Sequence, residues 1–440
     1  MFILKKNYYK DLNKIAIPLI IQNITGMLIG LVDQMFLGRI STEAYGAIGI
    51  SVSFMYFLAG IFGYFAVGFN IEGAKTKSQN DEEKFLQYFI SSFLLDIIIG
   101  ILYFIFIFSC AHPLFKVVYG LSGEALSAAI TYSFITSPYI LLQLFIFTYS
   151  SYFKIIKKTH ILLISSTVSL LINTVFDYLL IFGKLCFPKM GTAGAALSSI
   201  FSVFLNVCIL IFYDRKYIKS LLSSFSVSKN ILYDLIKKSL PLVGSELLEG
   251  TLFVVAINAI ISHIGVMEIS AFLLVKNFID IICISMFMYA SAEMTLSSEY
   301  IGKNRLSEIK SLTLNGIIIS ELIFVILGVI LVLFRNNAPK IISNDSELIA
   351  LAASLIIPML FMHLFNPAQT IYKYVLQACN ESKFVLYITA IINLAVVLVI
   401  ILLQLIKQNI FWIFAGLFIN YFTLTIIYSI RLNKQIKSSN

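Results

Sequence analysis

Twelve long apolar segments, separated by short polar ones, dominate the pattern along this chain. Most of them hold 20 to 25 residues, which matches the roughly 20 residues that an α-helix needs to cross about 30 Å of hydrocarbon. The pattern predicts an all-α integral membrane protein with twelve transmembrane helices. We place these at approximately 15–37, 47–69, 87–110, 125–149, 161–183, 192–213, 238–262, 268–294, 312–334, 347–372, 384–406 and 409–430.

Composition supports the membrane assignment and explains the positive charge. Of the 440 residues, 59% are hydrophobic and only 12% are charged, against about 25% charged in soluble domains. The net charge of +9 follows the loops: with the N-terminus inside, 23 Lys and Arg fall in cytoplasmic segments and seven in outer ones. By the positive-inside rule, we expect both termini in the cytoplasm and the chain in the plasma (inner) membrane. A nucleic-acid partner is not indicated, because the basic residues form no single patch.

Motifs for enzymatic chemistry are missing from the sequence. The five cysteines are scattered without a Cys-x-x-Cys spacing, and the four histidines are dispersed. No phosphate-binding loop, dinucleotide fingerprint or nucleophile elbow occurs. We therefore expect no enzyme, no metal site and no cofactor, and no obligate protein partner is evident. The energy for any transport by such a chain would come from an ion gradient or from a partner.

A weak internal repeat divides the chain into halves. "AIPLII" at 16–21 is similar to "SLPLVG" at 239–244, an offset of 223. Asn173 and Asn393 end similar apolar runs, at an offset of 220. An even number of spans per repeat makes the halves parallel, which is typical of transporters with a cavity between two rocking lobes.

The longest polar interruption gives the predicted boundaries of these lobes. It lies between the sixth and seventh spans. We predict an N-terminal six-helix lobe at 1–213, a cytoplasmic linker at 214–237 and a C-terminal six-helix lobe at 238–440.

The fifth span, "LLINTVFDYLLIFG", carries a polar stripe. Asn173 and Asp177 are four residues apart, so they share a helical face, and Ser166 and Ser169 continue it. A charged side chain at the bilayer centre costs at least about 2.5 to 3.5 kcal/mol, so it faces protein or a wet cavity. Serines alone would indicate ordinary packing with satisfied hydrogen bonds. The added aspartate favours a functional site.

A second acid lies at a similar depth in the first span. Asp33 follows about 18 residues of its span and Asp177 about 16 of its own, and both spans start at the cytoplasm. At about 1.5 Å per residue the two depths agree within a few ångströms. We predict that Asp33 and Asp177, with Asn173 beside them, form an ion-coupling site that binds H⁺ or Na⁺.

At these motifs the sequence resembles a known family. "LVDQMFLGR", "AYGAIGI", "INTVFDYLLIFG" and "GTAGAALSS" in the first half, with "SLPLVGSELLEGTLFVV" and "FNPAQTIYKYVLQACNES" in the second, resemble the multidrug and toxic compound extrusion (MATE) transporters. The resemblance implies a twelve-helix antiporter that exports amphipathic, often cationic, small molecules in exchange for H⁺ or Na⁺. It also implies that Asp33, Asn173 and Asp177 match the coupling residues of the DinF-like branch.

The C-terminal half departs from the family pattern. Glu249 matches an acid of the seventh helix in NorM-like members, but their tenth-helix aspartate is here Asn366. We expect this lobe to be secondary for ion coupling and to contribute to the substrate cavity. The predicted cavity residues are Ser166, Ser169, Glu246, Glu249 and Asn366.

The other intramembrane charges have plainer interpretations. Lys276 and Asp280, four residues apart, should neutralise one another. Lys373, near a cytoplasmic end, should extend its amine to the interface. Glu293 and Glu299 approach a cytoplasmic loop and should be solvated. Asp96 and Glu321 lie 225 positions apart, in register with the repeat, and have no assigned role.

Two other functions compete with export of small amphipathic compounds. A lipid-linked oligosaccharide or lipid flippase of the same broad superfamily would need a strongly cationic cavity, for which only Lys276 and Lys373 are available. A non-transporting scaffold or sensor would be expected to carry an appended soluble domain or a long loop, and neither is present in the sequence. The sequence therefore favours the exporter, with small molecules and the lipid bilayer as its partners.

Overall fold

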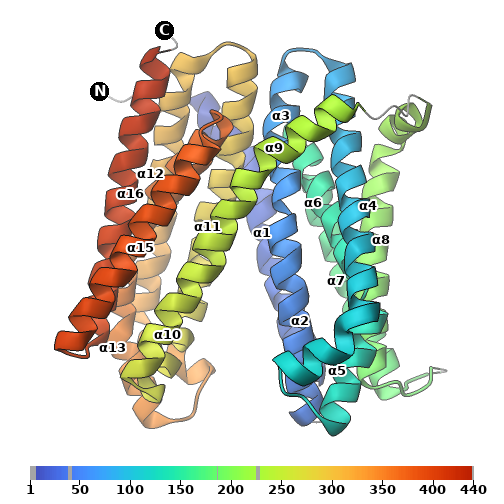
Figure 1. The fold of residues 1–440 in the computed structure, drawn as a ribbon, viewed down its shortest axis with the longest axis vertical. Coiled ribbons are helices and arrows are strands. Elements are labelled where there is room, and N and C mark those ends of the chain that lie inside the picture. Colours follow the sequence, from blue (N-terminus) through green and yellow to red (C-terminus); the bar gives the residue numbers. More distant parts are fainter. Residues whose placement is uncertain (1–5, 38–41, 186, 224–227, 439–440) are drawn as a thin grey trace. The chain divides into compact units, whose positions relative to one another are not determined.

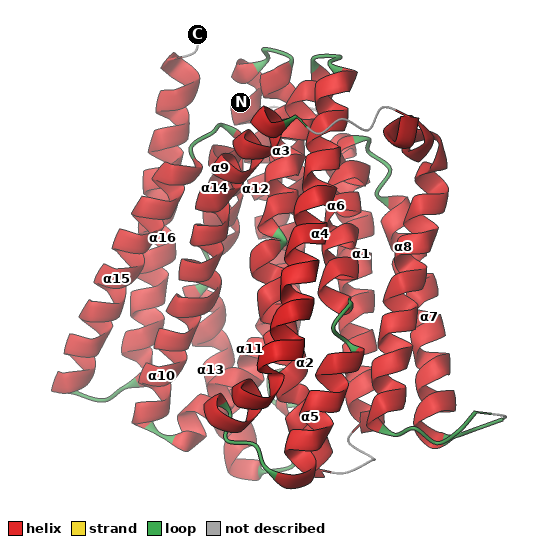
Figure 2. Ribbon diagram, turned by 45° about the vertical axis from the view of Figure 1, so that its right-hand side comes forward, coloured by secondary structure: helices red, strands yellow, loops and turns green. Residues whose placement is uncertain are grey.

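The computed structural model of the chain is helical throughout the part that it describes. The backbone is described at residues 6–37, 42–185, 187–223 and 228–438. Side chains at 6–7, 28–45, 47, 216–223 and 438 lie outside the description. These ranges contain no strand, as the predicted all-α class requires (Figure 2).

Sixteen α-helices and three short helical turns follow one another along the described ranges (Figure 1). They are α1 (Lys6–Leu37), α2 (Thr42–Phe62), α3 (Tyr64–Ser78), α4 (Glu82–Pro113), η1 (Leu114–Val118), α5 (Gly123–Ile135), α6 (Tyr139–Ile155), α7 (His160–Phe182), α8 (Thr192–Ser223), α9 (Lys229–Glu246), η2 (Leu247–Phe253), α10 (Val254–Ile264), α11 (Val266–Gly302), α12 (Leu306–Leu333), η3 (Ala338–Ile341), α13 (Ser346–Met362), α14 (Asn366–Ala378), α15 (Ser382–Ile406) and α16 (Ile410–Ser438).

Each of the twelve predicted spans falls on one helix or on one continuous series of helices. Within the described residues, nine helical segments are long and apolar enough to cross a membrane, and two bent helix pairs raise the number to eleven. The remaining predicted span, 15–37, lies in α1, whose outer side chains are not described. The chain is therefore an all-α, multi-pass membrane protein with the predicted order of spans.

Two of the spans are broken where proline begins a helix. The axes of α5 and α6 differ by 47° across the turn before Tyr139, and those of α13 and α14 differ by 42° across the turn before Asn366. Pro138 caps α6 and Pro367 occupies the first turn of α14. Proline lacks a backbone N–H and clashes with the preceding turn, so it begins a helix more readily than it continues one.

Much of the predicted linker at 214–237 is helical, because α8 extends to Ser223 and α9 begins at Lys229.

The seventh span changes from α-helix to π-helix and back along its length. Pro241 lies inside α9, and η2 is a π-helical segment between α9 and α10. Such π-helical turns are rare and are frequently found at functional sites. This segment carries Glu249.

Contacts within the chain define two compact units. The N-terminal unit comprises Ile21–Gly73 and Asp81–Ser239, and the C-terminal unit comprises Met1–Ile20, Ala74–Asn80 and Leu240–Asn440. In the N-terminal unit, α7 packs along α8, α2 on α5, and α4 on α6. The predicted boundaries of the two lobes and their linker stay a prediction.

In the C-terminal unit α11 is the central helix. It packs against α12, α13 and α14, while α15 packs along α16 (Figure 1). The contact between α11 and α12 includes a buried carboxylate, that of Glu293.

Candidate functional site

The polar stripe of the fifth span is buried against α8. Asn173 and Asp177 on α7 are 3% and 1% exposed. α8 begins with small residues that let the two helices approach: a Cβ at Gly194 would lie only 2.7 Å from the backbone carbon of Leu180. Close backbone approach at small residues is the common way that membrane helices pack. The burial of the carboxylate therefore follows from the sequence of both helices.

Asp177 has a partner that the sequence reasoning missed. The hydroxyl of Ser198 on α8, itself fully buried, donates a hydrogen bond to Asp177 Oδ1. Ser198 belongs to "GTAGAALSS", a motif that carries the family resemblance. Its position one turn after Gly194 is the signal that could have identified it.

Asn173, one turn before Asp177, has unused hydrogen-bonding capacity. Neither its Oδ1 nor its Nδ2 has a hydrogen-bond partner among the described residues, although the side chain is buried. Most buried polar side-chain atoms in proteins are hydrogen-bonded, so such a group calls for a ligand, a water or an ion. The amide and the carboxylate form one polar face inside the N-terminal unit.

The two serines of the stripe have local roles. Ser169 Oγ donates to the backbone carbonyl of Ser202 on α8 at 2.7 Å, and Ser166 Oγ donates to the carbonyl of Leu163 in its own helix at 3.1 Å. Their hydrogen bonds are therefore satisfied within the protein. Asp33 lies in α1, but its side chain is outside the described part of the structure. Its predicted proximity to Asp177 stays a prediction.

A second buried acid in the N-terminal unit is held by hydroxyl groups. Thr148 on α6 donates to Asp96 Oδ2 at 2.7 Å, and the hydroxyls of Thr148 and Ser92 are 2.8 Å apart. Asp96 is 1% exposed, and its Oδ1 has no partner among the described residues. This network joins α4 to α6.

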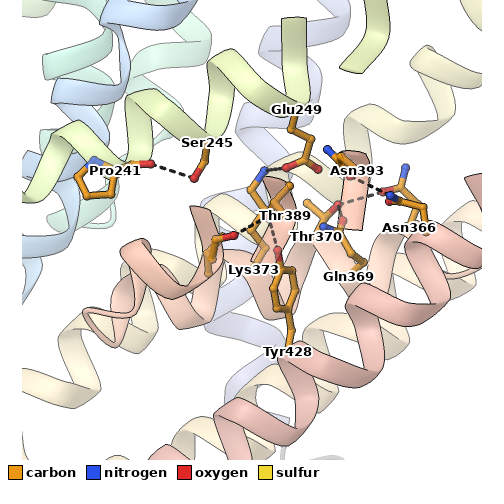
Figure 3. Close-up of polar contacts among 12 residues, drawn as sticks. Pro241, Ser245, Glu249, Asn366, Gln369, Thr370, Lys373, Thr389, Asn393 and Tyr428 are labelled. Atoms are coloured by element: carbon orange, nitrogen blue, oxygen red, sulfur yellow. Dashed lines mark hydrogen bonds and ion pairs between the residues drawn. The ribbon is translucent and has the colours of Figure 1, made fainter. Parts of the chain in front are cut away.

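In the C-terminal unit the central feature is a partly buried ion pair, drawn in Figure 3. Lys373 Nζ on α14 lies 2.6 Å from Glu249 Oε2 on η2, and the two side chains are 8% and 25% exposed. The prediction that Lys373 reaches the membrane interface is wrong. α14 is a separate, tilted helix, and it directs this lysine inward to an acid that lies 124 residues away in the sequence.

Polar side chains from α14 itself and from two further helices, α15 and α16, surround this pair (Figure 3). Thr389 on α15 and Tyr428 on α16 have their hydroxyls 2.5 Å apart. Asn420 donates to Asn393 Oδ1 at 2.8 Å. Asn366, at the start of α14, accepts a hydrogen bond from Thr370 at 3.2 Å. The seventh, tenth, eleventh and twelfth spans thus meet in one polar region.

Four further acids of the C-terminal unit have different surroundings. Glu246 lies over Gly250, in the same helical series as Glu249. Lys276 and Asp280 pair at 2.5 Å, which confirms their mutual neutralisation. Glu293, predicted to be solvated, is 0% exposed, so that prediction is wrong. Glu299, one helix turn and a half further on, pairs with Lys303 at 2.5 Å.

The architecture and these buried charges define a multi-pass membrane transport protein, and the sequence comparisons identify its family. A family model described as MatE matches residues 18–179 and 241–405. The chain belongs to this family. The two matches begin 223 positions apart, the same offset as the proline-containing repeat.

Individual relatives and solved structures agree with this assignment. The chain is 23% identical to the probable multidrug resistance protein NorM of Photorhabdus laumondii, over 96% of this chain and 95% of that protein. It is 24% identical to the Thermotoga maritima protein of the same name, over 78% and 74%. A solved structure described as the outward-facing conformation of a multidrug resistance MATE family transporter aligns with a TM-score of 0.88 at 17% identity, over 98% of this chain and 97% of that one. The DinF-like character of the N-terminal half stays a prediction.

Proposed function

We propose that this protein is a secondary active antiporter of the plasma membrane that exports small amphipathic, mostly cationic compounds in exchange for H⁺ or Na⁺. The relatives named above as multidrug resistance proteins support export of this kind. The observation that carries the coupling proposal is the buried face of Asn173 and Asp177, with Ser198 opposite. A carboxylate in this position is stabilised when a proton or a cation neutralises it.

The same site gives a physical route for exchange. On the outside, where the coupling ion is abundant, occupation neutralises the carboxylate and removes an acceptor for a cationic substrate. On the inside, loss of the ion restores the negative charge. Alternating access of the two lobes would then move the ion and the substrate in opposite directions.

A flippase for lipid-linked pyrophosphates is less compatible with the charges of the C-terminal unit. Lys276 and Lys373 were the two lysines available to such a headgroup. Each lies within 2.6 Å of a carboxylate oxygen, of Asp280 or Glu249. A lysine that is neutralised by an adjacent acid has less charge to offer a dianionic ligand.

Dye efflux from energised membrane vesicles tests the proposal. With one gradient collapsed at a time, we expect efflux to stop when the gradient of the coupling ion, H⁺ or Na⁺, is lost and to continue when only the other is lost, since the chain carries no nucleotide-binding motif. Vesicles lacking the protein provide the control. Efflux that continues after both gradients have been collapsed would contradict ion-coupled antiport.

A labelling experiment tests the proposed orientation. In a cysteine-free background, a cysteine at exposed Gln79 should be reached by a membrane-impermeant thiol reagent only after the cells are opened, whereas one at exposed Asn336 should react in intact cells. The reason is the excess of basic residues on the Gln79 side. Labelling of Gln79→Cys from the outside of intact cells would reverse the topology.

A further inference from the structure

Glu293 is a buried acid in the C-terminal unit that has no place in the mechanism proposed above. Its side chain is 0% exposed, and the group that approaches its carboxylate as a donor is the backbone amide of Gly316, in a geometry too poor for a normal hydrogen bond. It forms no ion pair within the described part of the chain. Glu293 therefore combines complete burial with little compensation, which is a costly environment for an ionised carboxylate.

The space for this acid is made by the helix opposite. The Glu293 carboxylate lies against the backbone of Gly316 on α12, where any side chain would collide with Oε1. One turn further along each helix, Ser297 on α11 and Ser320 on α12 are fully buried, and their hydroxyls have no partners among the described residues. The interface of the two helices therefore carries buried hydroxyls and backbone beside this carboxylate, and no second charge pairs with it.

Charged and titratable groups on the helices that pack against α11 have other contacts or exposed positions. The groups with a partner on the neighbouring helices are Lys373 with Glu249, His363 with Asn366, Glu321 with the backbone of Ala368, and Glu308 with Arg305 and Tyr8. The exposed groups on those helices are Lys310, Glu347 and His263. On α11 itself, Lys276 pairs with Asp280, Tyr289 with Asn13 and Glu299 with Lys303.

We infer that Glu293 is a proton-binding site, held as a neutral carboxylic acid between α11 and α12 and able to release its proton when water enters between these helices. The proton is the ligand that the geometry favours, because it removes the charge without requiring further ligands. Na⁺ would need several oxygens converging on it, and no other side-chain oxygen of the described residues lies within hydrogen-bonding distance of this carboxylate. The site lies in the other unit from Asp177, so it is separate from the proposed coupling site.

Infrared spectroscopy of the purified protein in lipid tests this inference. Near neutral pH we expect a carbonyl band of a protonated carboxylic acid that is lost in Glu293→Gln, which keeps the shape and neutrality of the acid. The band should also convert to carboxylate absorption as the pH is raised into the alkaline range. Glu299→Gln, six residues away in an ion pair at the helix end, is the matched control and should keep the band.

The outcome does not depend on whether the antiport proposal is correct, because the band can be measured without transport. Recording the spectra in an Asp177→Asn background also separates this acid from the other site. A Glu293→Gln spectrum identical to that of the parent protein at every pH would overturn the inference. So would a sodium-dependent thermal stabilisation that disappears in Glu293→Gln, since it would show a charged, metal-holding carboxylate.

Discussion

Replacing Asp177 with asparagine should abolish most ion-coupled efflux while leaving the protein folded in the membrane. Asparagine has almost the same shape and can still accept the hydrogen bond from Ser198, but it cannot bind and release a proton or neutralise a cation. An interaction with a charged group is worth about 1.5 to 3 kcal/mol, so the coupling ion should bind the variant roughly 10- to 100-fold more weakly. The measurement is substrate efflux against external pH at several sodium concentrations.

The matched control for this variant is Asp345→Asn. Asp345 caps the first turn of α13 through hydrogen bonds to the amides of Glu347 and Leu348, and asparagine is an equally good cap. We expect full efflux from this variant. Full efflux by the Asp177→Asn protein, with an unchanged dependence on pH and sodium, would contradict the coupling proposal. The polar stripe of α7 would then have only a role in helix packing.

The same experiment examines the predicted pairing with Asp33. If the two acids bind one ion together, Asp33→Asn should lose as much efflux as Asp177→Asn, and the double variant should be little worse than either. Ser198→Ala should have an intermediate effect, because it removes a donor to the carboxylate and leaves the acid itself in place. Additive losses in the double variant would indicate two independent sites.

Hydropathy alone was sufficient to predict the helical architecture, because backbone groups in a bilayer must be satisfied within each segment. The stripe on α7 was also predictable, since residues four apart must share a face. What the sequence pattern does not contain is the identity of the neighbouring helix. Ser198 became a partner of Asp177 only through the close packing of α7 on α8.

The two wrong predictions have the same physical origin. Glu293 was expected to be solvated because it lies at the end of span 268–294, next to a cytoplasmic loop, yet α11 continues to Gly302 and the carboxylate is fully buried. Lys373 was taken to be near an interface because span 347–372 was treated as one straight helix. In the structure α14 is bent away from α13, and an acid from η2 is available to the lysine. Position along a span predicts depth but does not predict which face is covered.

The ion pair of Glu249 and Lys373 should be the most sensitive point for the stability of the C-terminal unit. Removing one member of a buried pair leaves the other charge uncompensated, which typically costs about 3 to 5 kcal/mol. The lysine side chain is 8% exposed and the glutamate 25%. Glu249→Gln, which leaves the more buried charge with only the more distant Glu246 to compensate it, should therefore destabilise the protein more than Lys373→Met does.

Thermal unfolding of the purified protein in lipid, together with efflux, measures this asymmetry. The double variant Glu249→Gln with Lys373→Met should recover a large part of the lost stability, because it leaves no unpaired charge. Efflux by Glu249→Gln should be weakened or narrowed to fewer substrates, while ion-driven exchange stays detectable, since the coupling site proposed here is in the other unit.

The matched control is the pair of Lys276 and Asp280, whose side chains are 34% and 48% exposed. Lys276→Met should cost no more than about 1 kcal/mol, as exposed pairs do. If Glu249→Gln were as stable as Lys276→Met, the buried pair would have no structural role, and if it alone abolished ion coupling, the coupling site would have been placed in the wrong unit.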